Sequence, residues 1–269
     1  MKHDYLNDYL NLDDGKIFYS ISGKGDPIIL LHGNFNDHQI WNEQAEILSA
    51  YYETIRYDLR GYGLSSTPDS SFSNVHDLKA LIDFLKLPSV TLLGSSSGGA
   101  VAIDFSLTYP GLVRSLILVS PSVTGNSYPL PFMWHGLINY MNVTLRGREK
   151  AVEAFIASPF WRYYFPPLSN EEARNKVLRN VRNTDNFCRV PPKLTIAAKP
   201  YAISRLEEIN IPTLIFISDQ DHPFNLNTAE ILNTTIKHSS KIMMQGCGHL
   251  PFIEKPDEFN ERVLAFLSP

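Results

Sequence analysis

The feature of this sequence that most constrains its fold is the alternation of short apolar runs with longer segments of helical periodicity. Apolar runs bounded by turn residues are typical of strands buried on both faces of a sheet. Strands that alternate with helices predict βαβ units, and hence a parallel sheet flanked by helices. The expected strands are 27–31, 53–57, 89–93, 114–119 and 212–217, and the expected helices are 40–50, 75–85, 99–108 and 256–267.

The chain begins differently, with two short alternating runs at 9–12 and 16–21. They flank Asp13-Asp14-Gly15, and glycine adopts the positive φ that a tight turn requires. This pattern predicts a β-hairpin. An antiparallel start on an otherwise parallel sheet is common in mixed sheets.

The alternation of strands and helices stops after Pro121 and resumes at Ile211. Between about 123 and 208, prolines punctuate helical patterns and no segment has the pattern of a strand. Residues 169–172 read Ser-Asn-Glu-Glu, which is typical of a helix start with acidic residues in the first turn. We therefore expect an α/β core formed by 1–122 and 209–269, with a helical insertion at 123–208.

Composition excludes several classes of partner. The net charge is −4 and no basic run is present, so neither nucleic acid nor an anionic membrane is expected as a partner. The N-terminus lacks the apolar core of a signal peptide, and no segment approaches the ~20 apolar residues of a membrane span. We expect a cytoplasmic protein, and no feature of the sequence sets its oligomeric state. Cys188 and Cys247 are expected as free thiols, with a disulfide as the alternative.

A pentapeptide at 94–98 contains the candidate for a reactive residue. It reads Gly-Ser-Ser-Ser-Gly, follows the apolar run that ends at Leu93, and precedes a helical pattern. A strand-to-helix turn of the form G-x-S-x-G holds the central serine at its tip, and the helix N-terminus favours developing negative charge. We predict that Ser96 is a nucleophile. The alternative is a Ser/Gly-rich loop with no chemical role.

A serine hydroxyl is a weak nucleophile and needs a base that a third group orients. His249 lies in a loop after the apolar stretch 242–244, which favours it as the base. His222 is the rival, but it adjoins Asp221, and neighbouring residues on a loop point apart. Asp221 is the expected acid because it lies farther into its loop than Asp219, the alternative. The order Ser, Asp, His agrees with the order expected for such a fold.

A site of this kind also needs donors for an oxyanion. Segment 30–35 closes the first buried strand, and Gly33 lets backbone amides turn outward. The expected donors are the backbone N–H groups of Asn34 and Ser97. Removing one such donor typically costs about 3 kcal/mol of transition-state stabilisation. We interpret His32 as a buried, hydrogen-bonded scaffold residue.

Together these segments resemble the α/β-hydrolase superfamily over nearly the whole chain. Segment 57–65 (Tyr-Asp-Leu-Arg-Gly-Tyr-Gly-Leu-Ser) is similar to the family's D-x-R-G-x-G-x-S loop, and 248–256 is similar to its histidine loop. The resemblance implies that 123–208 is a cap over the active site. Two positions depart from the family: Ser95, where many members carry a large polar residue, and Ser218, where glycine is common. We expect Ser95 to alter the pocket floor.

The resemblance implies catalysis through an acyl-enzyme, with a small carboxylic ester or lactone as substrate. Dehalogenases and epoxide hydrolases of this fold use Asp as nucleophile, so Ser96 argues against both. A meta-cleavage-type C–C bond hydrolase is one alternative. A slow-turnover ligand receptor that keeps the triad is an alternative of a different class. No metal or organic cofactor is expected, because there is no ligand cluster and no G-x-G-x-x-G after a strand.

Aromatic residues of the insertion suggest a pocket. Segments 131–134 and 160–165 are rich in aromatic side chains. We expect Phe132, Trp134 and Trp161, together with Phe35, to line a pocket for an acyl or alcohol group. The alternative is that the aromatic side chains of the insertion pack its helices together and onto the core.

Overall fold

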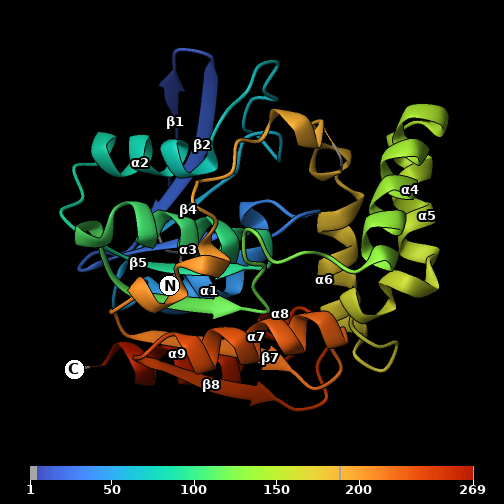
Figure 1. Cartoon of the computed structure of the whole chain (residues 1–269). Coiled ribbons are helices and arrows are strands. Elements are labelled where there is room, and N and C mark those ends of the chain that lie inside the picture. The colour runs from blue at the N-terminus through green and yellow to red at the C-terminus, as the bar shows by residue number, and fades with distance from the viewer. Residues whose placement is uncertain (1–4, 188, 269) are drawn as a thin grey trace.

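A computed structural model describes residues 5–187 and 189–268 and contains one eight-stranded sheet, ordered β1-β2-β4-β3-β5-β6-β7-β8 (Figure 1). The pairs β1–β2 and β2–β4 are antiparallel and all the other pairs are parallel, which confirms the predicted mixed α/β sheet. The strands are β1 (Leu6–Leu12), β2 (Gly15–Ser22), β3 (Pro27–Leu31), β4 (Glu53–Tyr57), β5 (Val90–Ser95), β6 (Val113–Val119), β7 (Thr213–Ser218) and β8 (Ser239–Met244).

Helices cover both faces of the sheet, which explains why the central strands are apolar throughout. In β3, Ile29 and Leu31 pack into one core cluster, whereas Ile28 and Leu30 pack into the other. The first cluster lies under α2 (Asn74–Phe84), α3 (Ser97–Thr108) and α7 (Pro223–Thr235). The second lies under α1 (Asn42–Leu48), α8 (Pro251–Glu254), α9 (Pro256–Leu267) and part of the insertion.

Several element boundaries differ from the prediction. The helix expected over 40–50 begins as a 3-10 turn, His38–Trp41, before α1. Helix α3 begins two residues before the expected start, directly after Ser96. The pattern did not predict α7, and it predicted only the end of β8. Strand β8 lies at the sheet edge with half of its residues exposed, so it lacks the apolar run that marks a buried strand.

The insertion between β6 and β7 is built from α4 (Leu130–Arg146), α5 (Arg148–Ala157), α6 (Glu171–Arg182) and short 3-10 turns. Within the described residues of this segment there is no strand, only one isolated bridge from Thr195 to Phe72. The side chain of Asn170 caps α6 by accepting a hydrogen bond from the Ala173 N–H. Figure 1 places α4, α5 and α6 beyond the carboxyl ends of the parallel strands, with α4 and α5 outermost, whereas the last part of the insertion, 202–208, lies back beside α3.

Two further observations bear on the sequence predictions. None of the helices in the described ranges is both long and apolar enough to cross a lipid bilayer. Cys247 is buried and carries a free thiol. Cys188, the second cysteine of the thiol-or-disulfide prediction, lies outside the described residues.

Candidate active site

Ser96 occupies a strained turn between β5 and α3. Its backbone has φ 51° and ψ −117°, which a residue with a side chain rarely adopts. The turn is held because the Ser96 N–H donates to the Val119 carbonyl over 2.9 Å. Gly98 is required on the inner side, since a Cβ there would overlap the carbonyl oxygens of Leu31 and His32. The strand–turn–helix setting predicted for the pentapeptide is therefore present.

The end of β3 approaches this turn closely. A Cβ on Gly33 would lie 3.0 Å from the Cβ of Ser96, so only glycine allows the two loops to meet without a shift. Asn34 Oδ1 accepts hydrogen bonds from the Ser97 hydroxyl (3.1 Å) and from the Tyr62 hydroxyl (2.8 Å). Asn34 and Ser97 thus lie in neighbouring loops. Because Ser97 is the first residue of α3, its N–H has no acceptor within the helix.

His249 and Asp221 form a buried pair at the carboxyl ends of β8 and β7. Nδ1 of His249 lies 3.0 Å from Oδ2 and 3.1 Å from Oδ1 of Asp221. The alternative acid, Asp219, is exposed and accepts a hydrogen bond from the Gly246 N–H instead. The structure therefore brings Asp221, and not Asp219, to the imidazole.

The environment of Asp221 stabilises its ionised form. Burial raises the pKa of this carboxyl. The charge interaction with His249 and the hydrogen bonds from His249 and Asn225 lower the pKa, and together they have the larger effect. The net pKa of Asp221 lies below its usual value. Asn225 Nδ2 donates to Asp221 Oδ1 over 2.7 Å and lies 3.2 Å from His249 Nδ1. Asn225 lies outside the motifs that predicted the site.

The other two histidines considered from the sequence have structural contacts. Nδ1 of His222 accepts a hydrogen bond from the Phe224 N–H and so caps α7. His32 is fully buried, and its Nδ1 donates to the Gly33 carbonyl while its Nε2 accepts from the Leu59 N–H. Burial lowers the pKa of His32, which favours the neutral ring. These contacts agree with its interpretation as a scaffold residue.

The loop that carries His249 is fixed from two sides. The His249 N–H donates to the Tyr163 carbonyl over 2.9 Å, and a Cβ on Gly248 would overlap that same oxygen. On the other side, Glu254 Oε1 accepts a hydrogen bond from the Gly248 N–H over 2.8 Å. Burial raises the pKa of Glu254 to about 7. Tyr163 belongs to the insertion, so the loop joins the core and the insertion.

A cavity of about 380 Å³ connects these elements. Ser96, His249, Asn34 and Asn225 line it on the core side. Among the described residues, its wall includes a set of aromatic side chains from both parts of the chain: Phe35, Tyr128, Phe132, Trp161, Tyr163 and Tyr164. No hydrogen bond joins Ser96 to His249 across the described part of this cavity, and such bonds often form only with substrate bound.

Not every residue predicted for the pocket lines it. Phe35, Phe132 and Trp161 do, whereas Trp134 is 60% exposed and lies outside the described lining. Ser95 is buried and does not line the cavity either. The expectations that Trp134 lines this pocket and that Ser95 shapes its floor are not met. Tyr163 and Tyr164, which do line it, belong to the aromatic segment 160–165.

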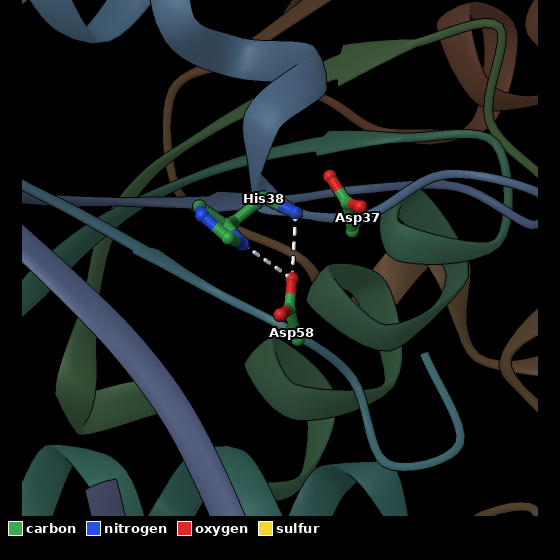
Figure 2. Close-up of side chains that lie close together, drawn as sticks. All are labelled: Asp37, His38 and Asp58. Carbon is green, nitrogen blue, oxygen red and sulfur yellow. Dashed lines mark hydrogen bonds and ion pairs between the residues drawn. The ribbon is translucent and has the colours of Figure 1, made fainter. Parts of the chain in front are cut away.

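A second buried cluster is formed by Asp37, His38 and Asp58 (Figure 2). Asp58 Oδ1 accepts hydrogen bonds from the backbone N–H of His38 (2.7 Å) and from its Nδ1 (2.8 Å). Both carboxyl oxygens of Asp37 accept hydrogen bonds from a set of insertion amides: Asn180, Asn183 and Asn186. Because protein donors occupy these oxygens, we interpret the cluster as a structural joint between core and insertion rather than a metal site.

Comparisons with known proteins agree with this architecture. The sequence profile of the alpha/beta hydrolase family matches residues 28–262. A 2-hydroxy-6-oxononadienedioate/2-hydroxy-6-oxononatrienedioate hydrolase from Pseudomonas putida is 29% identical, with 97% of this chain and 96% of that protein covered.

Two solved structures with lower sequence identity share the fold. Naproxen esterase from Bacillus subtilis superimposes with a TM-score of 0.80 at 19% identity, covering 99% of this chain and 92% of that one. The enol-lactonase from Burkholderia xenovorans LB400 also gives a TM-score of 0.80 at 19% identity, covering 97% of this chain and 100% of that one. The chain therefore belongs to the alpha/beta hydrolase family and is a hydrolase.

Proposed function

We propose that this protein is a serine hydrolase that cleaves a small, neutral carboxylic ester or lactone. One observation carries the proposal: Ser96, held in a strained turn, lines the same cavity as His249, whose far ring nitrogen contacts Asp221. A nucleophile, a base and an orienting acid are what acyl transfer through serine requires.

In this mechanism the Ser96 hydroxyl attacks the carbonyl carbon of the substrate while Nε2 of His249 accepts its proton. Asp221 stabilises the resulting imidazolium and keeps Nδ1 protonated. Collapse of the tetrahedral intermediate breaks the C–O bond, and the leaving alkoxide takes the proton from His249. Water, deprotonated by His249, then attacks the acyl-enzyme, and the acid product leaves as Ser96 regains its proton.

The negative charge of the intermediate needs preorganised donors. We assign them to the backbone N–H groups of Asn34 and Ser97, at the adjoining ends of β3 and β5. Support comes from the close approach at Gly33 and from the Ser97–Asn34 hydrogen bond, which holds the two loops together. Donors fixed before the reaction stabilise charge without reorganisation.

The insertion 123–208 acts in this proposal as a cap, and residues 1–122 and 209–269 as the core. The cap supplies Phe132, Trp161 and Tyr164 to the cavity wall. Tyr164 also ties the cap to the loop that carries Asn34, because its hydroxyl donates to the Asn34 carbonyl and accepts from the Asn36 amide. A wall rich in aromatic side chains favours an apolar acyl or alcohol group.

The second candidate is a C–C bond hydrolase, which the Pseudomonas putida relative brings into consideration. The substrate in that relative's name is a dioate and carries two carboxylates at neutral pH. Among the described residues that line the cavity there is no Lys or Arg to pair with them. Burying an unpaired carboxylate is strongly unfavourable, which favours a neutral ester.

Hydrolysis of p-nitrophenyl esters from acetate to decanoate tests the proposal, together with a fluorophosphonate probe on wild type and Ser96→Ala. We expect turnover that depends on acyl length and labelling that the substitution abolishes. A matched pair of esters that differ only by a terminal carboxylate tests charge, and the neutral member should have the higher kcat/KM.

Each outcome separates the candidates. Labelling without ester turnover would favour the C–C hydrolase or a ligand receptor with slow turnover. Preference for the carboxylate-bearing ester would contradict the neutral substrate. Absence of both labelling and turnover would exclude the serine mechanism.

A further inference from the structure

Helix α4 presents an apolar face to solvent. Of its seventeen residues, Asn139 alone is buried among the described side chains. Figure 1 shows α4 on the outer side of the insertion, packed along α5. Large apolar side chains project from one side of the helix, and we call them the α4 outer face: Leu130, Met133, Trp134, Leu137, Tyr140, Met141 and Leu145.

The exposure of this face is high for every member. Leu130 is 79% exposed, Leu145 is 75% exposed, and Tyr140, the least exposed, is still at 37%. Taking about 200 Å² for a fully exposed large side chain, the α4 outer face presents roughly 800 Å². A standard protein–protein interface buries about 800 Å² on each partner, whereas contiguous apolar patches on monomers are usually smaller. The area therefore matches one side of a stable interface.

The composition of the face distinguishes a protein partner from a lipid surface. Helices that lie on membranes carry Lys and Arg on their polar side. Helix α4 carries one charged residue, Arg146 at its last position, and contains no Asp, Glu or Lys. Aromatic side chains and Met without charge are what interface cores between protein subunits contain, and Trp134, Tyr140 and Met141 fit that description.

We propose that two copies of this chain associate through the α4 outer face. A two-fold axis near Leu137, the middle of the face, lets each copy cover the same surface of the other, as closed dimers require. The contact also reaches the active-site cavity, because Met133 and Gly136 of α4 line it. Trp134, which lies outside the cavity, lies in this proposal about one helical turn from the axis, within the dimer contact.

Sedimentation velocity over 0.5–50 µM tests the proposal with Leu137→Glu and Leu145→Glu. Leu168→Glu is the matched control, because Leu168 is 82% exposed in the insertion but lies outside α4. We expect wild type and the control to sediment as dimers and both α4 variants as monomers. Circular dichroism and thermal denaturation verify that each variant is folded.

Tryptophan fluorescence gives a second readout that needs no substitution. Trp41 and Trp161 are already buried, so association changes mainly the surroundings of Trp134. We expect the wild-type emission to shift to shorter wavelength as the dimer forms, and Trp134→Phe to remove this shift.

Three results would overturn the proposal. If the wild-type protein stays monomeric and its tryptophan emission does not change with concentration, it has no such interface. A dimer that persists in both folded α4 variants uses another surface. A monomer that binds phosphatidylglycerol vesicles, and loses that binding in Leu137→Glu, would assign the face to lipid. None of these results depends on whether the protein hydrolyses esters.

Discussion

The carboxylate of Asp221 lies 3.0 Å from Nδ1 of His249 and also accepts hydrogen bonds from the side-chain amide of Asn225 (2.7 Å) and the backbone N–H of His222 (2.6 Å). A carboxylate with several such donors is fixed in orientation and remains ionised. The imidazole is then held with its Nδ1 protonated and its Nε2 free to act as a base. This arrangement makes separate predictions for the acid, for the amide and for the loop that carries His249.

Replacing the acid should nearly abolish catalysis. In Asp221→Asn we expect kcat on p-nitrophenyl butyrate to fall about 1,000- to 10,000-fold, because the imidazole loses its orienting charge. Asp219→Asn is the control, since Asp219 is exposed and contacts Gly246 rather than the ring. A severe loss in Asp219→Asn with a mild one in Asp221→Asn would reverse the assignment of the acid.

The amide of Asn225 should act through Asp221. Asn225→Ala removes a hydrogen bond to a buried charge, and we expect kcat to fall about tenfold with a smaller change in KM. Asn227, exposed on the same helix, provides the matched control Asn227→Ala. Because the substitution raises the pKa of Asp221, activity should also fall at a higher pH on the acid side. An unchanged pH profile would indicate that Asn225 serves the fold alone.

Sequence patterns predicted the central strands well, because burial on both faces leaves an unmistakable apolar run. Strands β3 and β4 begin and end at the predicted residues, and so does α9. The edge strand β8 is half exposed, and its polar residues conceal it. The position of Asp221, farther into its loop than Asp219, predicted its pairing with His249, and the two residues follow neighbouring parallel strands.

The residues of the cavity wall were less predictable, because they depend on which side of each insertion helix faces the core. Phe132 and Trp134 are two positions apart on α4, so they point to different sides of the helix. Phe132 faces the cavity, whereas Trp134 faces solvent. Asn225 lies four positions after Asp221 at the start of a helix, a spacing that brings the two together only if the helix begins at Pro223. Pro223 at the first helical position is the signal that could have placed this start.

The joint at Asp37 should contribute strongly to stability. Asp37→Ala removes the acceptor from buried Asn180 and half-buried Asn183, while Asn186 loses one of its two acceptors and keeps the Asn180 carbonyl. We expect a loss of about 2–4 kcal/mol in the free energy of unfolding. Asp185→Ala, an exposed change in the same part of the insertion, should alter stability little. Urea denaturation monitored by circular dichroism measures both. Equal stability of the two variants would show that the amides find other partners when Asp37 is absent.

Glu254 should make stability depend on pH near neutrality. Its pKa in the folded protein is about 7, because burial disfavours the charged form, against a usual value of 4.5. An acid whose pKa is raised by folding contributes stability that is fully present below its unfolded pKa and is lost as the pH rises through its folded pKa. Asp219, Asp221, His249 and the Gly248 N–H also act on this carboxyl.

Glu254→Gln removes this titration but keeps an oxygen that can accept from Gly248. Relative to wild type, the variant should therefore gain on the order of 1–3 kcal/mol in unfolding free energy between pH 5 and pH 8. Glu261→Gln, at an exposed position of α9, should show no such gain. Urea denaturation at pH 5 and pH 8 measures the unfolding free energy of each protein. The comparison requires that the m-values of variant and wild type are equal. If the difference between Glu254→Gln and wild type is the same at both pH values, Glu254 does not titrate in this range. Glu254 would then keep the same charge from pH 5 to pH 8 while it accepts the hydrogen bond from Gly248.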